Sequence, residues 1–291
     1  MRRALREHWP EYLMEGVLLG GFMLAACVYG VLLDHPASPV RRALGDPLPR
    51  RLLFGVLMGL TAVAIIYSPW GKRSGAHINP AWTLTTLRLG RAAPWDAAFY
   101  AAAQFAGASA GVLLASALLG PRLAHADVHY VTTRPGAWGV AAAVAAEVVI
   151  TAVLASVVLR VAASPRHMRH TGLLVGALVA AYIAVEAPLS GMSMNPARSF
   201  GSALVAGEWT ALWIYFVAPP LGMLAAAELF LRARRHPDPL RDRAVAARAL
   251  PCMKLRPHGA GEPCLFCDYA AERADDAPAP RTQQLAALET R

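Results

Sequence analysis

Six long apolar segments are the feature that most constrains how this chain can fold. Each is close to the ~20 residues that an α-helix needs to cross the hydrocarbon of a bilayer. The segments lie near residues 12–33, 52–69, 94–119, 138–161, 171–187 and 209–231. A membrane β-barrel would instead show short segments of alternating hydrophobicity, which this sequence lacks. The sequence therefore predicts an all-α membrane protein with six transmembrane helices.

Basic residues suggest how these helices are oriented. The net charge is +9, and most basic clusters fall on connections that would share one side of the membrane, at residues 2–6, 72–91, 160–169 and 232–235. Such clusters mark the cytoplasmic side. The exceptions, on the opposite side, are Arg41, Arg42, Arg50 and Arg51. We therefore expect a multi-pass protein of the plasma or inner membrane with both termini in the cytoplasm. No motif suggests nucleic-acid binding.

The chain contains an internal repeat. Glu15 in the first apolar segment and Glu147 in the fourth are each followed by a further segment, an Asn-Pro-Ala tripeptide and another segment. The halves cover about residues 1–119 and 138–231. Because each half holds three full segments, an odd number, the second must cross the membrane in the opposite sense, as an inverted repeat. Residues 1–231 would form one membrane domain, and the polar, Pro-rich residues 232–291 a cytoplasmic tail.

The two Asn-Pro-Ala tripeptides predict short helices inside the membrane. Pro80 and Pro196 suit the first helical position, which needs no N–H, and Asn79 and Asn195 suit the N-cap. Each helix would run for about ten residues, about half the thickness of a bilayer. Two such re-entrant half-helices, one from each face, would meet at the midplane and complete a seventh, broken span.

The meeting point has a predictable chemistry. Two helix N-termini bring two positive dipole ends together. If each Asn carbonyl caps its own helix, the amide NH₂ groups are free to donate into a cavity. The oxygen of a neutral solute could accept these hydrogen bonds, whereas a cation would be repelled and a proton-conducting chain of water interrupted.

These features together resemble the aquaporin family, the major intrinsic proteins, over about residues 8–231. The resemblance rests on the six segments, the repeated Glu, and both motifs, which include Ala81 and Ala197, with Arg198 directly after the second. It implies a homotetramer with one pore per subunit, in which residues 1–231 form a channel domain that passes water or small neutral solutes passively. The Ala- and Arg-rich composition suggests a bacterial source.

Arg198 matches the Arg that lies at the outer constriction of family members. The resemblance places Met58, or alternatively Gly59, with Ile183 and Met192 at the other constriction positions. The aromatic residue and the His typical of the family's water channels are missing there. An apolar ring of this kind removes water at greater cost, because polar groups lose hydrogen bonds in it. It favours facilitated passage of glycerol, hydrogen peroxide or neutral metalloid acids with little water flux. Conversely, Ser199, Ala203 and the pair Tyr215 and Phe216 resemble the water-channel type.

Other polar residues in the membrane domain are expected to be structural. Glu15 and Glu147 would accept hydrogen bonds from the irregular backbone before each Asn, and His77 would offer a backbone carbonyl. Gln104 would contact a neighbouring helix. An ion-coupled secondary transporter, the alternative from another class, would need more ionisable residues near the midplane. A structural or sensory membrane protein is a further alternative. No nucleophile and base pattern suggests an enzyme, and no cofactor is required.

The tail holds a group of metal-binding residue types. Cys264 and Cys267 have the spacing of one edge of a zinc site, and Cys252 with His258 could complete it. Because cytoplasmic thiols are kept reduced, metal or redox chemistry is favoured there over a structural disulfide. Zinc binding, thiol redox chemistry and the absence of any role remain alternatives.

Overall fold

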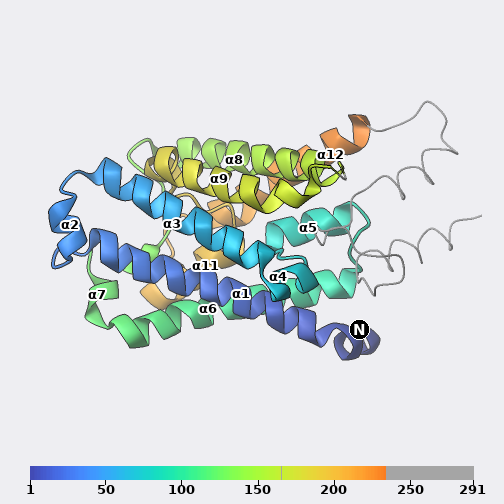
Figure 1. Ribbon diagram of the computed structural model, residues 1–291, viewed down its shortest axis with the longest axis horizontal. Coiled ribbons are helices and arrows are strands. Elements are labelled where there is room, and N and C mark those ends of the chain that lie inside the picture. Colours follow the sequence, from blue (N-terminus) through green and yellow to red (C-terminus); the bar gives the residue numbers. More distant parts are fainter. Residues whose placement is uncertain (165, 234–291) are drawn as a thin grey trace, which may run out of the picture.

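The computed structural model describes residues 1–164 and 166–233, and this part of the chain is helical, with no strand. Six long helices carry the fold, and all six are long and apolar enough to cross a membrane. They are α1 (Arg2–Asp34), α3 (Pro47–Tyr67), α6 (Pro94–Leu119), α8 (Gly139–Ala162), α9 (Thr171–Val185) and α12 (Trp213–Ala233). They run along the long axis of the molecule (Figure 1). The prediction of six spanning helices is confirmed.

Shorter helices lie between the long ones. They are α2 (Pro39–Ala43), α4 (Pro69–Ser74), α5 (Pro80–Arg88), α7 (Pro121–Ala124), η1 (His129–Val131), η2 (Met168–His170), α10 (Ala187–Ser190) and α11 (Pro196–Ala206). Seven helices (α2, α3, α4, α5, α6, α7 and α11) begin with proline at the first helical position. Proline is favoured there because its fixed φ is helical and its missing N–H is not needed.

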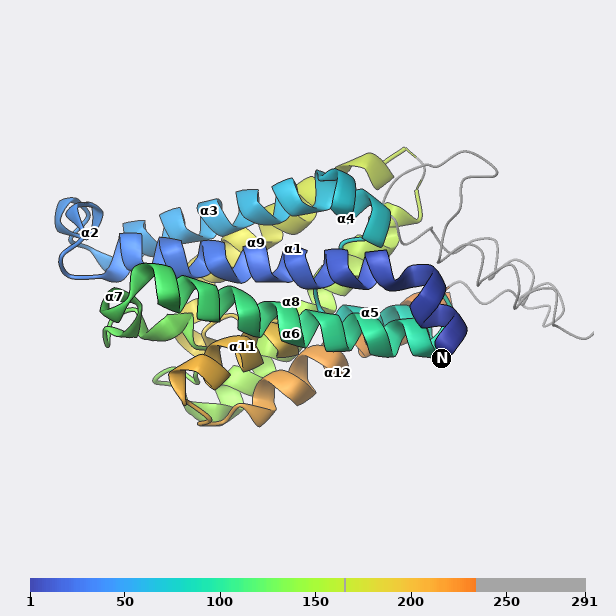
Figure 2. The same cartoon turned by 90° about the horizontal axis from the view of Figure 1, so that it is seen from below.

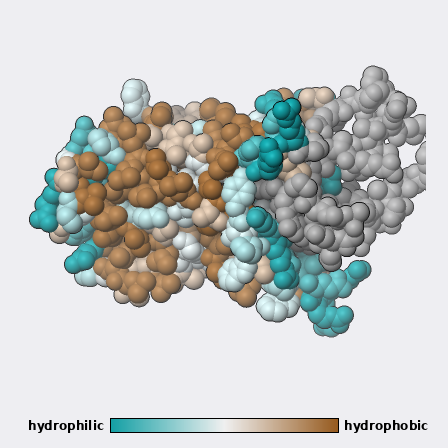
Figure 3. All heavy atoms as spheres, in the orientation of Figure 1, coloured by the Kyte–Doolittle hydropathy of each residue, from teal (hydrophilic) through white to brown (hydrophobic). Residues whose placement is uncertain are grey.

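The surface of the helical bundle carries an apolar belt. In Figure 3 hydrophobic residues cover the middle of the molecule, and hydrophilic residues gather toward its two ends. The exposed side chains of the long helices include Leu13, Val56, Leu60, Leu113 and Val149. Exposed apolar side chains in such number suit contact with lipid rather than water.

The first helix begins ten residues earlier than its hydropathy predicts, at Arg2 instead of Tyr12. Polar contacts to α6 hold this added segment in place. The His8 Nδ1 atom lies 3.0 Å from Asp96 Oδ1, and the Tyr12 hydroxyl donates to the same oxygen at 2.5 Å. A hydropathy pattern cannot reveal such contacts, since they join residues far apart in the sequence.

Small residues allow the long helices to pack closely. A Cβ added to Gly107 of α6 would collide with the carbonyl oxygen of Gly16 in α1, and one added to Gly59 of α3 would collide with that of Gly176 in α9. Helices in membranes associate through this kind of close backbone approach. The pairs α1–α6 and α3–α9 thereby form a rigid frame around the centre.

The two re-entrant half-helices, α5 and α11, lie inside this frame. In both views α5 lies toward the end of the molecule that holds the N-terminus, and α11 lies toward the opposite end (Figures 1 and 2). Their first residues are Pro80 and Pro196, and Asn79 and Asn195 are the N-caps. The predicted seventh, broken span is therefore present.

Candidate pore

Asn79 and Asn195 join the two half-helices at their N-termini. The Asn79 Oδ1 atom accepts a hydrogen bond from the Ala81 N–H at 2.9 Å, and the Asn195 Oδ1 atom accepts one from Ala197 at 3.0 Å. Each side-chain amide also donates to the opposite loop. The Asn79 Nδ2 atom lies 2.8 Å from the Met194 carbonyl oxygen, and the Asn195 Nδ2 atom lies 2.7 Å from that of Ile78.

These cross-loop bonds correct one expectation. The sequence suggested that both N–H bonds of each amide face a cavity. In the structure, one N–H of each amide donates instead to a backbone carbonyl oxygen in the loop of the other repeat. These two hydrogen bonds join the loops. An amide has two N–H donors, so one per Asn is left for a solute.

The backbone before each cap adopts an unusual conformation. The φ angles of Gly75, Ala76 and Ile78 are positive, and so are those of Gly191, Met192 and Met194 in the second repeat. A positive φ is uncommon for residues other than glycine and is a source of strain, most of all for a β-branched residue such as Ile78. Surrounding contacts must therefore hold these stretches open.

Two buried carboxylates make those contacts. Glu15 accepts hydrogen bonds from the backbone N–H groups of His77 at 2.9 Å and Ile78 at 2.5 Å. Glu147 accepts the equivalent bonds from Ser193 at 2.7 Å and Met194 at 2.8 Å. Both glutamates are fully buried. The carboxylates thus bind the loop backbone in the two repeats in the same way.

Side chains add further donors to each carboxylate. Ser74 Oγ donates to Glu15 at 2.7 Å, and Ser190 Oγ donates to Glu147 at 2.6 Å. Gln104 Nε2 donates to Glu15 at 2.8 Å, so this residue contacts a neighbouring helix through the carboxylate itself. Sequence reasoning did not assign the two serines. The recurrence of Ser-Gly five residues before each Asn could have identified them.

His77 lies beside this network and is itself buried. Its backbone N–H donates to Glu15, and its ring Nδ1 atom lies 3.1 Å from the Thr83 hydroxyl. The corresponding pair in the second repeat is Ser193 and Ser199, whose hydroxyl oxygens are 2.5 Å apart. The repeat is therefore preserved in its side-chain contacts even where the residue types differ.

A cavity of about 430 Å³ runs past both caps. Its walls include stripes of residues four apart, which share one face of a helix. The stripe on α3 consists of Phe54, Met58, Ala62 and Ile66, and the stripe that begins on α9 consists of Val175, Val179, Ile183 and Ala187. Asn79, Asn195 and the loop residues before them form another part of the wall, and residues of α1, α8 and α12 also line it. The cavity is thus mostly apolar, with polar groups at the half-helices and the loops before them, and at Asp34 and Arg51.

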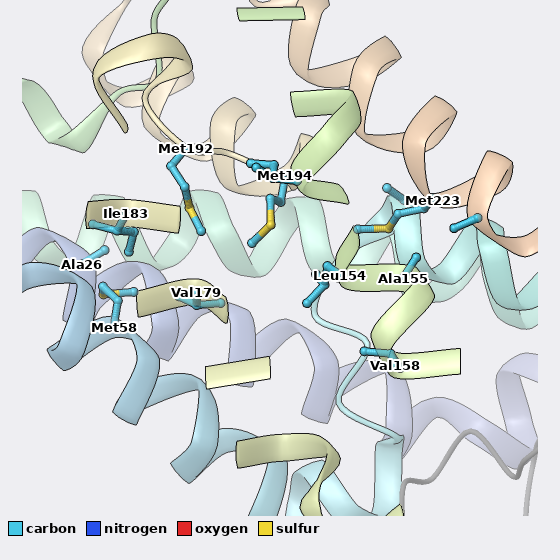
Figure 4. Close-up of a cluster of buried hydrophobic side chains, with 13 residues drawn as sticks. Ala26, Met58, Leu154, Ala155, Val158, Val179, Ile183, Met192, Met194 and Met223 are labelled. Atoms are coloured by element: carbon cyan, nitrogen blue, oxygen red, sulfur yellow. The ribbon is translucent and has the colours of Figure 1, made fainter. Parts of the chain in front are cut away.

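The four residues expected at the constriction all line this cavity: Met58, Ile183, Met192 and Arg198. Figure 4 shows Met58, Ile183 and Met192 pointing toward one another from α3, α9 and the loop before α11. Gly59, the alternative to Met58, packs against the backbone of Gly176 and does not line the cavity. The structure therefore favours Met58 at this position.

Arg198 is held by a residue that sequence reasoning did not identify. Its Nη1 atom donates to the carbonyl oxygen of Val131 at 2.8 Å, and Val131 and Thr132 line the cavity. Both belong to the irregular connection between the two repeats. Because every residue has a backbone carbonyl, the residue type at position 131 could not have predicted this hydrogen bond.

The tail residues assigned to a candidate zinc site, Cys252, His258, Cys264 and Cys267, lie outside the described residues. Within residues 1–164 and 166–233, no group of His, Cys, Asp or Glu side chains could hold a metal ion.

Comparisons with known proteins agree with this geometry. The family model of the major intrinsic proteins matches residues 52–230. Aquaporin NIP1-3 of rice (Oryza sativa subsp. japonica) is 39% identical over 194 residues, which cover 66% of this chain and 65% of the rice protein. The protein NIP7-1 of Arabidopsis thaliana, also described as an aquaporin, is 31% identical over 238 residues, which cover 79% of this chain and 81% of that protein. Both are plant proteins, so the bacterial source suggested by the composition stays a prediction.

A solved structure shares the fold. The aquaglyceroporin from Plasmodium falciparum superposes with a TM-score of 0.64 at 18% sequence identity, covering 77% of this chain and 96% of that one. The alignment to the rice relative spans slightly less than two thirds of that protein's length. The family match covers more than half of the chain and includes both half-helices. The chain is therefore a multi-pass membrane protein that belongs to the major intrinsic protein family.

Proposed function

We propose that this protein is a passive channel for water and small neutral solutes. The observation that carries the proposal is the cavity bordered by both Asn caps at the meeting point of α5 and α11. One N–H of each amide remains available there, so a solute oxygen can accept two hydrogen bonds while it is surrounded by an apolar wall. Two donors at fixed positions replace part of the solute's hydration.

The same geometry opposes the passage of cations and protons. The N-termini of two helices point at the centre of the cavity, and Arg198 adds a positive charge at one constriction. A cation at this point would meet positive potential from both half-helices. Water molecules that accept bonds from both amides would be oriented in a way that interrupts proton transfer along the cavity.

A facilitator for glycerol, hydrogen peroxide or neutral metalloid acids, with little water flux, is the second candidate. The apolar ring of Met58, Ile183 and Met192 favours it, because water gains no hydrogen bonds from these side chains whereas the carbon atoms of glycerol contact them well. Among the three solute groups, glycerol has the carbon skeleton that suits this ring best.

An ion-coupled transporter has less support. The carboxylates of Glu15 and Glu147 are occupied by loop donors, which suits a static support rather than a site that binds and releases an ion. The family consists of channels rather than enzymes, and we propose no catalytic activity for this chain.

The orientation in the membrane is also a proposal. Arg73 in α4 pairs with Glu11 near the N-terminus at 2.8 Å, and Arg88 in α5 pairs with Glu228 near the end of α12 at 2.5 Å. Basic residues therefore gather at the end that holds the N-terminus, which supports a cytoplasmic location for both termini. A plasma or inner membrane location and a homotetramer follow from the family resemblance.

Solute flux into proteoliposomes tests the proposed function. Stopped-flow light scattering would compare vesicles that contain the full chain with protein-free vesicles under gradients of sucrose, glycerol and urea. A passive channel predicts faster volume changes than in protein-free vesicles, with weak temperature dependence and no saturation. Fast water flux would favour the first candidate, and fast glycerol flux with slow water flux the second. Flux that saturates, or no added flux for any solute, would contradict a channel.

A further inference from the structure

The second repeat contains a buried carboxyl group that has no counterpart in the first. Glu186 lies between α9 and α10, one residue after the spanning segment ends, and is 5% exposed. Neither of its carboxylate oxygens has a hydrogen-bond partner within the described part of the chain. The position that corresponds to it in the first repeat, four residues before the loop serine, is the exposed Trp70. A buried carboxylate without partners is strongly disfavoured, so its protonation state must be explained.

The support of the two loop glutamates is also unequal. Glu15 receives four donors, one of which is Gln104 on α6, whereas Glu147 receives three. No described residue of α12 supplies a side-chain donor to Glu147 in the way that Gln104 of α6 supplies one to Glu15. The tyrosine contact, by comparison, is present in both repeats: Tyr215 of α12 donates to the Ser190 carbonyl oxygen at 2.5 Å, and Tyr100 of α6 donates to that of Ser74 at 2.7 Å. Glu147 in the second repeat therefore accepts one hydrogen bond fewer than Glu15 in the first.

Ser190 connects the two carboxyl groups. Its hydroxyl lies beside Glu186, one helical turn away, and its single proton is donated to Glu147 at 2.6 Å. The Ser190 oxygen can still accept a hydrogen bond, because a hydroxyl has two lone pairs. A charged Glu186 could offer nothing to it, but a protonated Glu186 could donate its own O–H.

We propose that Glu186 is a positioning residue: as an uncharged acid it donates to Ser190 Oγ, and this chain of hydrogen bonds completes the support of Glu147 and of the loop that carries Met192 and Arg198. The inference rests on the proposed function, since that loop forms one wall of the candidate pore. The O–H of Glu186 thereby supports Glu147 indirectly through Ser190, whereas the Gln104 amide of the first repeat donates to Glu15 directly.

The charges around Glu186 favour the uncharged form. Burial raises the pKa of its carboxyl to about 8, and the charge of Glu147 from α8 adds to this rise. Tyr215 approaches from α12 and Tyr182 lies one turn earlier on α9, and neither supplies a positive charge. Arg51 of α3 donates to the carbonyl oxygen of Ala184, two residues before Glu186, at 2.8 Å.

The sign of the pH effect follows from linkage. Glu186 keeps its proton in the folded protein at pH values where an unfolded chain has lost it, so the folded state binds more protons between about pH 4.5 and pH 8. Stability therefore falls as the pH rises through this interval, and the contribution of this residue becomes constant above about pH 8. A Gln at position 186 can donate to Ser190 but does not titrate.

The test compares the full chain with Glu186→Gln in thermal unfolding and in water flux from pH 5 to pH 9. We expect similar melting temperatures at pH 5, and a widening gap in favour of Glu186→Gln up to about pH 8. We also expect wild-type flux to fall at least twofold between pH 7 and pH 9 and flux through Glu186→Gln to stay constant. The proposal would be overturned if the melting temperatures of the wild type and Glu186→Gln changed in parallel with pH. It would also be overturned if flux through the two proteins had the same pH dependence.

Two further variants separate this role from a general packing role. Glu186→Leu has similar size but no donor, so we expect reduced flux at every pH and no pH dependence; wild-type flux in this variant would overturn the proposal. Glu208→Gln is the matched control, because Glu208 is a loop carboxylate whose pKa is lowered by the hydrogen bonds that it accepts from Thr210. It should keep the wild-type melting profile from pH 5 to pH 9. If neither the wild type nor Glu186→Gln passes any solute, the proposed function fails. The pH dependence of their melting temperatures would still test the role of Glu186.

Discussion

Among the residues that line the candidate pore, Arg198 is the one on which we expect selectivity to depend most. Its guanidinium lines the cavity beside three apolar side chains and is fixed by the Val131 carbonyl oxygen. A positive charge at a constriction repels cations, and its donors compensate solutes for lost water. In contrast with the Asn caps, it acts through charge as well as through hydrogen bonds.

Replacing Arg198 with Ala should therefore open the cavity to larger and charged solutes. If the side chain contributes only about 1.4 kcal/mol to the barrier for cations, sodium flux into proteoliposomes rises roughly tenfold. Glycerol flux should rise as well. Arg134→Ala is the matched control, because Arg134 is exposed in the same connection that supplies Val131. An unchanged sodium flux in Arg198→Ala would show that exclusion depends on the half-helices alone.

Gln104 offers a test of the loop support. Gln104→Leu removes one of four donors from Glu15 in a fully buried site. We expect a loss of about 1–3 kcal/mol in the free energy of unfolding, since a buried carboxylate loses one of its hydrogen-bond donors. Thermal or denaturant unfolding in detergent would measure it. Ser109→Ala on the same helix removes only a bond to the backbone carbonyl of Phe105 and should cost less; an equal loss in both variants would argue against a special role for Gln104.

At the scale of helices, glycine contacts decide how closely the frame packs. Gly107 of α6 faces the Gly16 carbonyl oxygen of α1, whereas Gly21 of α1 has open space around it. Gly107→Ala should therefore destabilise the fold by about 1–3 kcal/mol through overpacking. Gly21→Ala should be neutral or stabilising by up to about 1 kcal/mol, because alanine favours helices. Melting temperatures that fall equally in both variants would contradict this packing.

The elements also show what the sequence can and cannot predict. The half-helices follow from Asn79, Pro80, Asn195 and Pro196, because cap and first-turn preferences are local. The early start of α1 does not follow, since contacts to Asp96 hold it. The choice between Met58 and Gly59 stayed open because only packing against Gly176 separates them. Support from the Val131 carbonyl oxygen and the burial of Glu186 depend on tertiary contacts with no local signal.

At the scale of the whole molecule, two repeats of opposite orientation build one cavity. Each repeat supplies a frame of long helices, a strained loop held by a glutamate and a half-helix that begins at an Asn cap. The cross-loop bonds from Asn79 to Met194 and from Asn195 to Ile78 join the repeats at the centre. Solutes would therefore have to pass through the cavity that runs past both caps, which is the central claim about this protein.

Reversible blocking of the cavity tests that claim most directly. Met192 lines the cavity, so Met192→Cys can be labelled with a small neutral methanethiosulfonate, with the wild type as control for the cysteines already present. Flux in proteoliposomes, of water or of glycerol, should fall severalfold after labelling of Met192→Cys, recover with a reductant, and remain unchanged in the wild type. Unaltered flux through fully labelled Met192→Cys would contradict passage through the cavity past the two Asn caps.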